Sequence, residues 1–106
     1  MPKYLFEVKY TLDGMRGLKE KGGTDRVAAS KAFVEELGGT IESFYFAFGG
    51  RDAFIIADLP DNVAGAAAGL IVGSSGGVNS ACTVLLTPEE IDEAAKRQLN
   101  YRPPGN

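Results

Sequence analysis

Four short segments rich in apolar, β-branched and aromatic residues restrict the fold of this 106-residue chain more than any other feature. Residues 4–11 give the clearest case, because Tyr4, Phe6, Val8 and Tyr10 fall on one face of an extended chain. Successive side chains of a β-strand point to opposite faces, so a period of two indicates a half-buried strand. We therefore expect strands at residues 4–11, 40–48, 53–59 and 78–86.

Helical patterns separate or follow these strands. Apolar residues between positions 25 and 37 recur at helical spacing, with Thr24 as the expected N-cap and a glycine pair as the stop. The run from Thr87 to Glu90 reads Thr-Pro-Glu-Glu, which is typical of a helix start with a capping box. We expect helices at residues 12–21, 25–37, 63–74 and 88–98.

The order of these elements is β-α-β-β-α-β followed by a terminal helix. The Gly-Gly-Arg-Asp run at 49–52 joins two strands closely and indicates a hairpin. This order predicts an α+β, ferredoxin-like fold: a four-stranded antiparallel sheet with its helices on one face. We expect a single domain over residues 1–98 and an extended tail over residues 99–106, where two consecutive prolines cannot continue a helix.

The strand at 53–59 is apolar on both of its faces. It places Phe54 and Ile56 on the side opposite to Ile55 and Leu59. A sheet with helices on one side only should be polar at every second position of the other side, where it meets water. We therefore expect a second copy of the chain to cover that side, as a homodimer or a higher homo-oligomer in which two sheets close into a barrel. The alternative is a monomer that tolerates surface hydrophobic residues.

Several motifs resemble one known family. They are Thr11-Leu12-Asp13-Gly14, Glu35-Glu36-Leu37-Gly38-Gly39, Ser43-Phe44-Tyr45, and Phe48-Gly49-Gly50-Arg51-Asp52 before an apolar strand that ends Leu59-Pro60-Asp61. Together they are similar to the GYD domain family over nearly all of residues 1–95. The resemblance implies a dimeric α+β barrel and brings no established activity. The Gly-Tyr-Asp motif that names the family reads Gly50-Arg51-Asp52 here, so no role of its tyrosine is carried over.

Composition excludes several kinds of chemistry. The chain has no histidine and one cysteine, Cys82, which argues against a metal site, a histidine-based triad and a disulfide; we expect no cofactor. A net charge of −3 argues against nucleic acid as a partner. No apolar run is long enough to span a membrane, and the N-terminus has no signal-peptide pattern, so we expect a cytoplasmic protein. Cys82 lies among apolar strand residues and is expected to be a buried, inert thiol.

Six polar residues are candidates for ligand binding. Glu7 and Lys9 share the less apolar face of the first strand, and Ser43 and Tyr45 come from the second strand. If that face lines a cavity, these groups would suit an acidic or phenolic ligand; the alternative is a solvated or salt-bridged face. In the hairpin, Arg51 is a candidate clamp for a carboxylate, whereas Asp52 is also a common turn residue that accepts backbone N–H bonds; the six are Glu7, Lys9, Ser43, Tyr45, Arg51 and Asp52.

Two further features of the sequence bear on binding. Arg26, early in its helix, is a second candidate for binding an anion, although most such residues are solvated. Gly65, Gly69 and Gly73 recur every four residues and form one row of a helix. Because glycine weakens a helix interior, this row indicates close packing against the sheet or another subunit, or else a ligand cavity.

The sequence supports two functional hypotheses. The first is a homo-oligomeric binding protein of unassigned role that holds a small molecule in a cavity. The alternative is a cofactor-independent enzyme of monooxygenase or isomerase type that acts on an apolar or aromatic acid. In that alternative Tyr45, Lys9 and Arg51 hold a carboxylate or phenolate, and such groups act as general acids and bases without imidazole.

Overall fold

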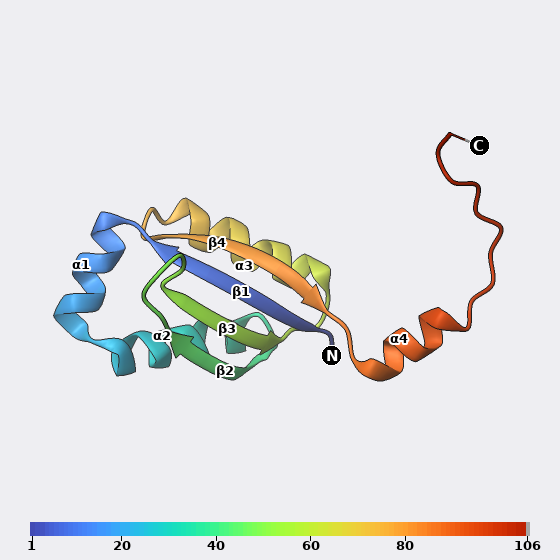
Figure 1. Ribbon diagram of the computed structural model, residues 1–106. Coiled ribbons are helices and arrows are strands. Elements are labelled where there is room, and N and C mark those ends of the chain that lie inside the picture. The colour runs from blue at the N-terminus through green and yellow to red at the C-terminus, as the bar shows by residue number, and fades with distance from the viewer. Residues whose placement is uncertain (106) are drawn as a thin grey trace.

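The computed structural model describes residues 1–105 and has an α+β architecture with one antiparallel sheet (Figure 1). The strands occur in the order β2-β3-β1-β4, which is the ferredoxin-like arrangement that the sequence predicts. The elements are β1 (Lys3–Tyr10), α1 (Leu12–Lys21), α2 (Gly23–Glu36), β2 (Thr40–Phe46), β3 (Ala53–Asp58), α3 (Asn62–Ser74), β4 (Val78–Leu85) and α4 (Pro88–Ala95).

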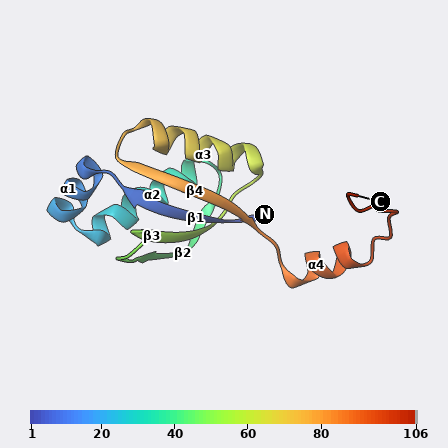
Figure 2. The same ribbon diagram turned by 45° about the horizontal axis from the view of Figure 1, so that its top comes forward.

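The two faces of the sheet differ in what covers them. Helices α2 and α3 lie on one face, where the β1 residues Tyr4, Phe6, Val8 and Tyr10 are buried (Figure 2). Helix α2 packs mainly on β2, and α3 packs mainly on β4, so the two helices cover opposite edges of the sheet. Among residues 1–105 no helix lies over the other face, which we call the open face (Figure 2).

The β2–β3 hairpin is longer than the sequence suggests. Strand β2 ends at Phe46, so the connection includes Ala47 and Phe48, and the Ala47 N–H donates to the Asp52 carbonyl at 2.8 Å. The pairing of the two strands shifts by one residue between Ile41 and Ser43, which is a β-bulge. Because of the bulge, the side chains of β2 do not alternate regularly between the two faces along the whole strand.

Helix α2 begins differently from the sequence-based expectation. Thr24 is not its N-cap, because the helix already starts at Gly23 and Gly22 holds the cap position without a side-chain hydrogen bond. Gly22 has φ +87°, a left-handed conformation that glycine adopts without steric cost, and this lets α1 run almost directly into α2. Thr87 does cap α4, with Glu90 completing the capping box as expected.

The glycine row of α3 is only partly explained by packing. A Cβ at Gly65 would lie 3.3 Å from Cε1 of Tyr4, so this residue lets the helix approach the sheet. Gly69 and Gly73 have open space where their Cβ atoms would be. Close packing within one chain therefore accounts for Gly65 alone.

Beyond β4 the chain leaves the body of the molecule. Helix α4 and the residues after it project away from the sheet, and α4 ends at Ala95 rather than at position 98 (Figures 1 and 2). The radius of gyration is 17.0 Å, whereas a compact chain of this length has about 13 Å. Within residues 1–105, none of the helices combines the length and apolar character that crossing a bilayer requires.

Candidate functional site

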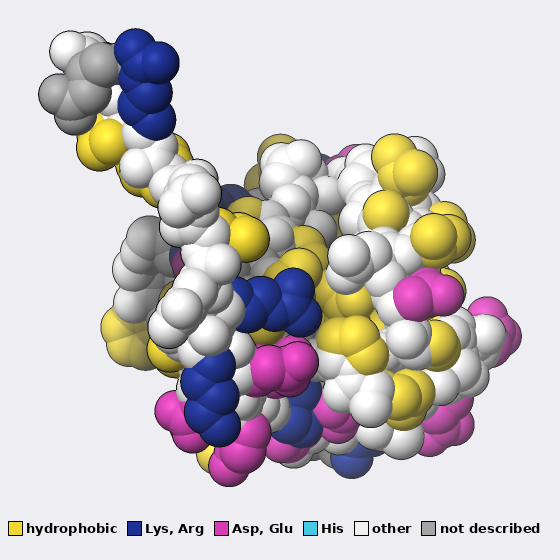
Figure 3. Space-filling model, turned by 90° about the vertical axis from the view of Figure 1, so that its right-hand side faces the viewer, with side chains coloured by type: hydrophobic (Ala, Val, Ile, Leu, Met, Phe, Trp, Pro, Cys, Tyr) yellow, Lys and Arg dark blue, Asp and Glu magenta, His cyan; other side chains and the backbone are white. Residues whose placement is uncertain are grey.

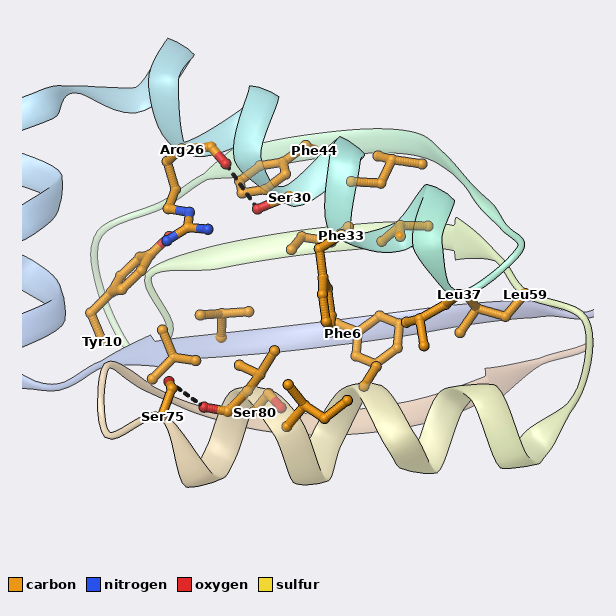
Figure 4. A pocket seen from close by; sticks show the side chains of 18 residues that line it. Phe6, Tyr10, Arg26, Ser30, Phe33, Leu37, Phe44, Leu59, Ser75 and Ser80 are labelled. Atoms are coloured by element: carbon orange, nitrogen blue, oxygen red, sulfur yellow. Dashed lines mark hydrogen bonds between the residues drawn. The ribbon is translucent and has the colours of Figure 1, made fainter.

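A cleft of about 350 Å³ separates α2 from α3 on the helix-covered face of the sheet (Figure 4). Its floor is β1, where Phe6 and Val8 line the cleft, and its walls include Phe33 of α2 and Val72 of α3. Most of the lining is apolar. Apolar pockets with a few polar groups are the usual form of small-molecule sites, and volumes of about 300–1,000 Å³ are typical.

The cleft is open because α2 and α3 pack on different strands and not closely on each other. From the small-residue stretch Ala64 to Gly69 only Ala68 lines the cleft, and Ile71, Val72 and Ser75 complete this wall. Gly65 and Ala68 are the buried residues of the helix. Since α2 and α3 sit on opposite edges of the sheet, these side chains do not fill the space between them.

One end of the cleft is polar. Tyr10, Arg26 and Ser75 line this end, and the same three residues also line a neighbouring cleft of about 430 Å³ along α1, whose other charged lining residues are Asp13, Lys21 and Asp25. Figure 4 shows the Arg26 side chain beside the ring of Tyr10. A ligand in the apolar cleft can therefore place a polar head where the two clefts meet.

The Arg26 guanidinium has no carboxylate partner among residues 1–105. The backbone of Arg26 is hydrogen-bonded within its own helix: its N–H donates to the Gly22 carbonyl at 3.3 Å, and its carbonyl accepts from the Ser30 hydroxyl at 2.9 Å. Burial raises the pKa of Tyr10, an effect that Arg26 opposes and Asp52 reinforces. The phenol thus stays neutral at physiological pH and offers an O–H donor beside a cation. This end of the cleft suits an anion.

The six residues proposed from the sequence lie elsewhere, at the open face and the adjoining hairpin. The strand register places Glu7 of β1 opposite Phe54 of β3, and Phe54 opposite Tyr45 of β2. Ser43 follows the bulge on the same face. None of the six lines either of the two clefts; they are Glu7, Lys9, Ser43, Tyr45, Arg51 and Asp52.

Four of these residues form two ion pairs. Arg51 Nε lies 4.0 Å from Glu7 Oε1, and Lys9 Nζ lies 3.5 Å from Asp52 Oδ1. Both predicted cations are therefore already near carboxylates of their own chain. The sequence correctly places Glu7 and Lys9 on one face, whereas their partners depend on how the hairpin folds back.

Asp52 is the buried member of this group, with 8% of its surface exposed. Its carboxylate accepts the backbone N–H of Tyr10 at 2.8 Å, and its own N–H donates to the Val8 carbonyl at 2.8 Å. These bonds fasten the hairpin to β1. This geometry supports the structural interpretation of Asp52, in which it accepts a backbone N–H bond.

The rest of the open face is apolar in the middle and charged at its far end. Leu5 and Ile56 pair across β1 and β3 in the middle. At the far end Lys3 Nζ donates to Glu42 and to Asp58, each at 2.9 Å. Hydrogen bonds to these carboxylates raise the pKa of Lys3 above its usual value, with that to Glu42 contributing most.

The expectation of a buried Cys82 is wrong for the single chain, where this residue is exposed. It pairs with Phe6 and so lies on the helix-covered side, but β4 is an edge strand and α3 does not cover it fully. The partial burial that remains raises the pKa of the thiol. No group of His, Cys, Asp and Glu residues in the described part of the chain is arranged to hold a metal ion.

The apolar lining of the cleft is what the sequence analysis did not recognise. From the sequence, Phe6, Phe33 and Leu37 could be recognised only as core residues, although they line the cleft. A signal was present in the run of small residues in α3, which indicated a groove of some kind, and in Arg26, which was recognised as an anion-binding candidate. The sequence could not show that Arg26 and α3 border the same cleft, because this depends on the distance between two helices.

The sheet order and the helix arrangement define a ferredoxin-like α+β protein. The family model described as GYD domain matches residues 4–95. The chain therefore belongs to the GYD domain family, as the sequence motifs indicate. No curated protein and no solved structure matches the chain.

Proposed function

We propose that this GYD-domain protein binds an apolar or aromatic carboxylic acid in the cleft between α2 and α3. The observation that carries the proposal is the position of Arg26, whose unpaired guanidinium lies at one end of an otherwise apolar cleft of about 350 Å³. The apolar body of the ligand lies over Phe6 and beside Phe33. Its carboxylate lies at the junction with the second cleft, beside Arg26 and Tyr10.

The chemistry of Arg26 favours a carboxylate as the head group. Guanidinium groups bind planar carboxylates through two parallel N–H···O bonds, and the Tyr10 hydroxyl adds a neutral donor. A neutral ligand of the same shape would fill the apolar part equally well but would leave the guanidinium without a partner. The polar end therefore gives specificity, and the apolar part gives most of the affinity.

We also propose that the protein works as a homodimer through the open face. In support, the middle of that face carries Leu5, Phe54 and Ile56, and Tyr45 at its edge is 72% exposed. Burying a large apolar side chain contributes about 1.5–3 kcal/mol. Sedimentation velocity should give a dimer that Phe54→Lys weakens, and a wild-type monomer at micromolar concentration would contradict this part of the proposal.

The enzymatic alternative stays a prediction without a supporting observation. It requires Tyr45, Lys9 and Arg51 to face one ligand. In the single chain Lys9 and Arg51 are near Asp52 and Glu7 instead. Binding at the α2–α3 cleft uses a different set of residues and does not depend on this group.

Two naphthalene compounds of nearly equal shape test the proposed ligand class. Isothermal titration calorimetry would compare 2-naphthoate with 2-naphthalenemethanol on the wild-type protein and on Arg26→Gln. We expect the acid to bind the wild type about fivefold more tightly than the alcohol, because Arg26 is exposed and an exposed ion pair contributes up to about 1 kcal/mol. Arg26→Gln should remove that preference while leaving the affinity for the alcohol nearly unchanged.

A matched control separates the position of the charge from its mere presence. Arg16→Gln removes the same charge from α1, at a residue that lines neither cleft. It should leave the preference for the acid intact. Equal binding of acid and alcohol by the wild type, or an equal loss in both variants, would overturn the assignment of Arg26.

A further inference from the structure

The C-terminal arm, defined here as residues 86–105, carries apolar side chains that its own chain does not cover. Ile91 is 52% exposed, Leu99 is 87% exposed and Tyr101 is 76% exposed. None of the residues of α4 is buried. Figure 3 views the molecule from the end that carries the arm and shows the arm standing away from the body. In this conformation the arm has no surface of its own chain to pack on.

The charge of α4 indicates what kind of surface it meets. Its first turn contains Glu89 and Glu90, and Asp92 and Glu93 follow. Membranes with anionic lipids and nucleic acids would both repel such a helix. Glu89 and Asp92 have no basic partner among residues 1–105, so the helix favours a protein surface that carries unpaired cations.

Helix α1 offers such a surface. Arg16, Lys19 and Lys21 are exposed there without a carboxylate partner among the described residues, and these three cations outnumber the two acidic residues of the helix, Asp13 and Glu20. Beside them Leu12 and Met15 are exposed apolar residues, at 66% and 41%. The surface of α1 thus combines both features that complement the arm, namely positive charge and uncovered apolar groups.

Within one chain these two surfaces cannot meet, because α1 and α4 lie at opposite ends of the molecule (Figure 1). The molecule is elongated, with extents of 56 × 32 × 22 Å. A two-fold axis that crosses the strands reverses the ends of the second copy. The arm of one copy then lies beside α1 of the other, and symmetry makes the contact twice.

We propose that the arm of each protomer docks on α1 of a second copy, with α4 against Lys19 and Lys21 of the partner subunit. This rests on the dimer proposed above and adds its orientation and its outer contact. The apolar residues of the arm, Leu99 and Tyr101, extend the contact toward Leu12 of the partner subunit.

A charge exchange tests the pairing. Glu89→Lys with Asp92→Lys on the arm, and Lys19→Glu with Lys21→Glu on α1, should each raise the dimer dissociation constant about tenfold at low salt, since the exposed pairs occur twice. The chain that carries all four substitutions should recover to within about threefold of the wild type. Sedimentation velocity measures all three. No recovery in the fourfold variant would overturn the proposal.

Cross-linking between chains separates this proposal from the dimer itself. In a Cys82→Ser background, a tagged chain with Ile91→Cys is coexpressed with an untagged chain that has Met15→Cys. We expect a disulfide-linked pair of unlike chains on mild oxidation. Leu70→Cys on α3, where Leu70 is 74% exposed, is the matched control in place of Met15→Cys and should not cross-link.

The outcomes distinguish the two proposals. A dimer without the Ile91–Met15 cross-link, or with an equal cross-link to Leu70→Cys, overturns the arm contact and leaves the dimer intact. A monomer in sedimentation overturns both.

Discussion

Among single side-chain hydrogen bonds, we expect the loss of the one made by Asp52 to lower the free energy of unfolding the most. Its carboxylate accepts the buried N–H of Tyr10 at 2.8 Å and lies 3.5 Å from Lys9 Nζ. Asp52→Ala leaves the Tyr10 N–H without an acceptor, and an unsatisfied buried donor costs about 1–3 kcal/mol. The ion pair adds at most about 1 kcal/mol, because nearly half of the Lys9 side chain is exposed.

Two variants separate the hydrogen bond from the charge. Asp52→Asn keeps an acceptor for Tyr10 and should cost no more than about 1 kcal/mol, and Lys9→Gln should cost about as little. Asp52→Ala should lower the melting temperature by roughly 10 °C, at about 4–8 °C per kcal/mol. Urea unfolding followed by circular dichroism measures the free energy of unfolding of all three variants, and thermal unfolding gives the melting temperature. Equal losses in Asp52→Ala and Asp52→Asn would refute the view that the Tyr10 hydrogen bond dominates.

Three further predictions test other parts of the structure. Gly39→Ala should destabilise the fold by more than about 1 kcal/mol, because the added Cβ would collide with the Asp58 carbonyl oxygen. Gly69→Ala, where the added Cβ meets open space, should stabilise α3 by about 0.5–1 kcal/mol. Urea unfolding that ranks the two variants the other way would contradict this prediction. Burial raises the pKa of Tyr10, so above about pH 10 the unfolded chain loses this proton before the folded chain does. The free energy of unfolding should therefore fall as pH rises, and the fall should be smaller in Tyr10→Phe. An identical pH profile for both proteins would exclude Tyr10 as the cause. The raised pKa of Cys82 should make its alkylation by iodoacetamide at pH 8 slower than that of an unstructured cysteine peptide, as measured by mass spectrometry, and an equal or faster rate would show that burial does not control the thiol.

The order of the elements could be read from the sequence because it depends on local periodicity. The alternation in β1 and the capping box of Thr87 are properties of short segments. Thr24 failed as a cap because Gly22, with its positive φ, lets α2 start at Gly23, two residues earlier than a cap at Thr24 would allow. At the start of α2, the backbone turn at Gly22 therefore decided where the helix begins, although Thr24 has a favourable capping side chain.

The candidate site depends on tertiary distances that no single segment contains. Arg26 was identifiable as a cation, but its place at the end of a cleft follows from the way α2 and α3 pack on different strands of the sheet. The pairing of Lys9 with Asp52 likewise required the hairpin to fold back onto β1. Cys82 was misjudged because the sequence does not reveal which strand lies at the edge of the sheet.

The most direct test of the account is to locate 2-naphthoate on the protein by nuclear magnetic resonance. In a titration of ¹⁵N-labelled protein, we predict that amide shifts concentrate at Ser30, Phe33, Val72 and Ser75, with contacts between naphthalene protons and the Val72 methyl groups. Shifts that concentrate instead on the open face around Tyr45, or no shifts at all, would contradict the claim that the cleft between α2 and α3 is the binding site.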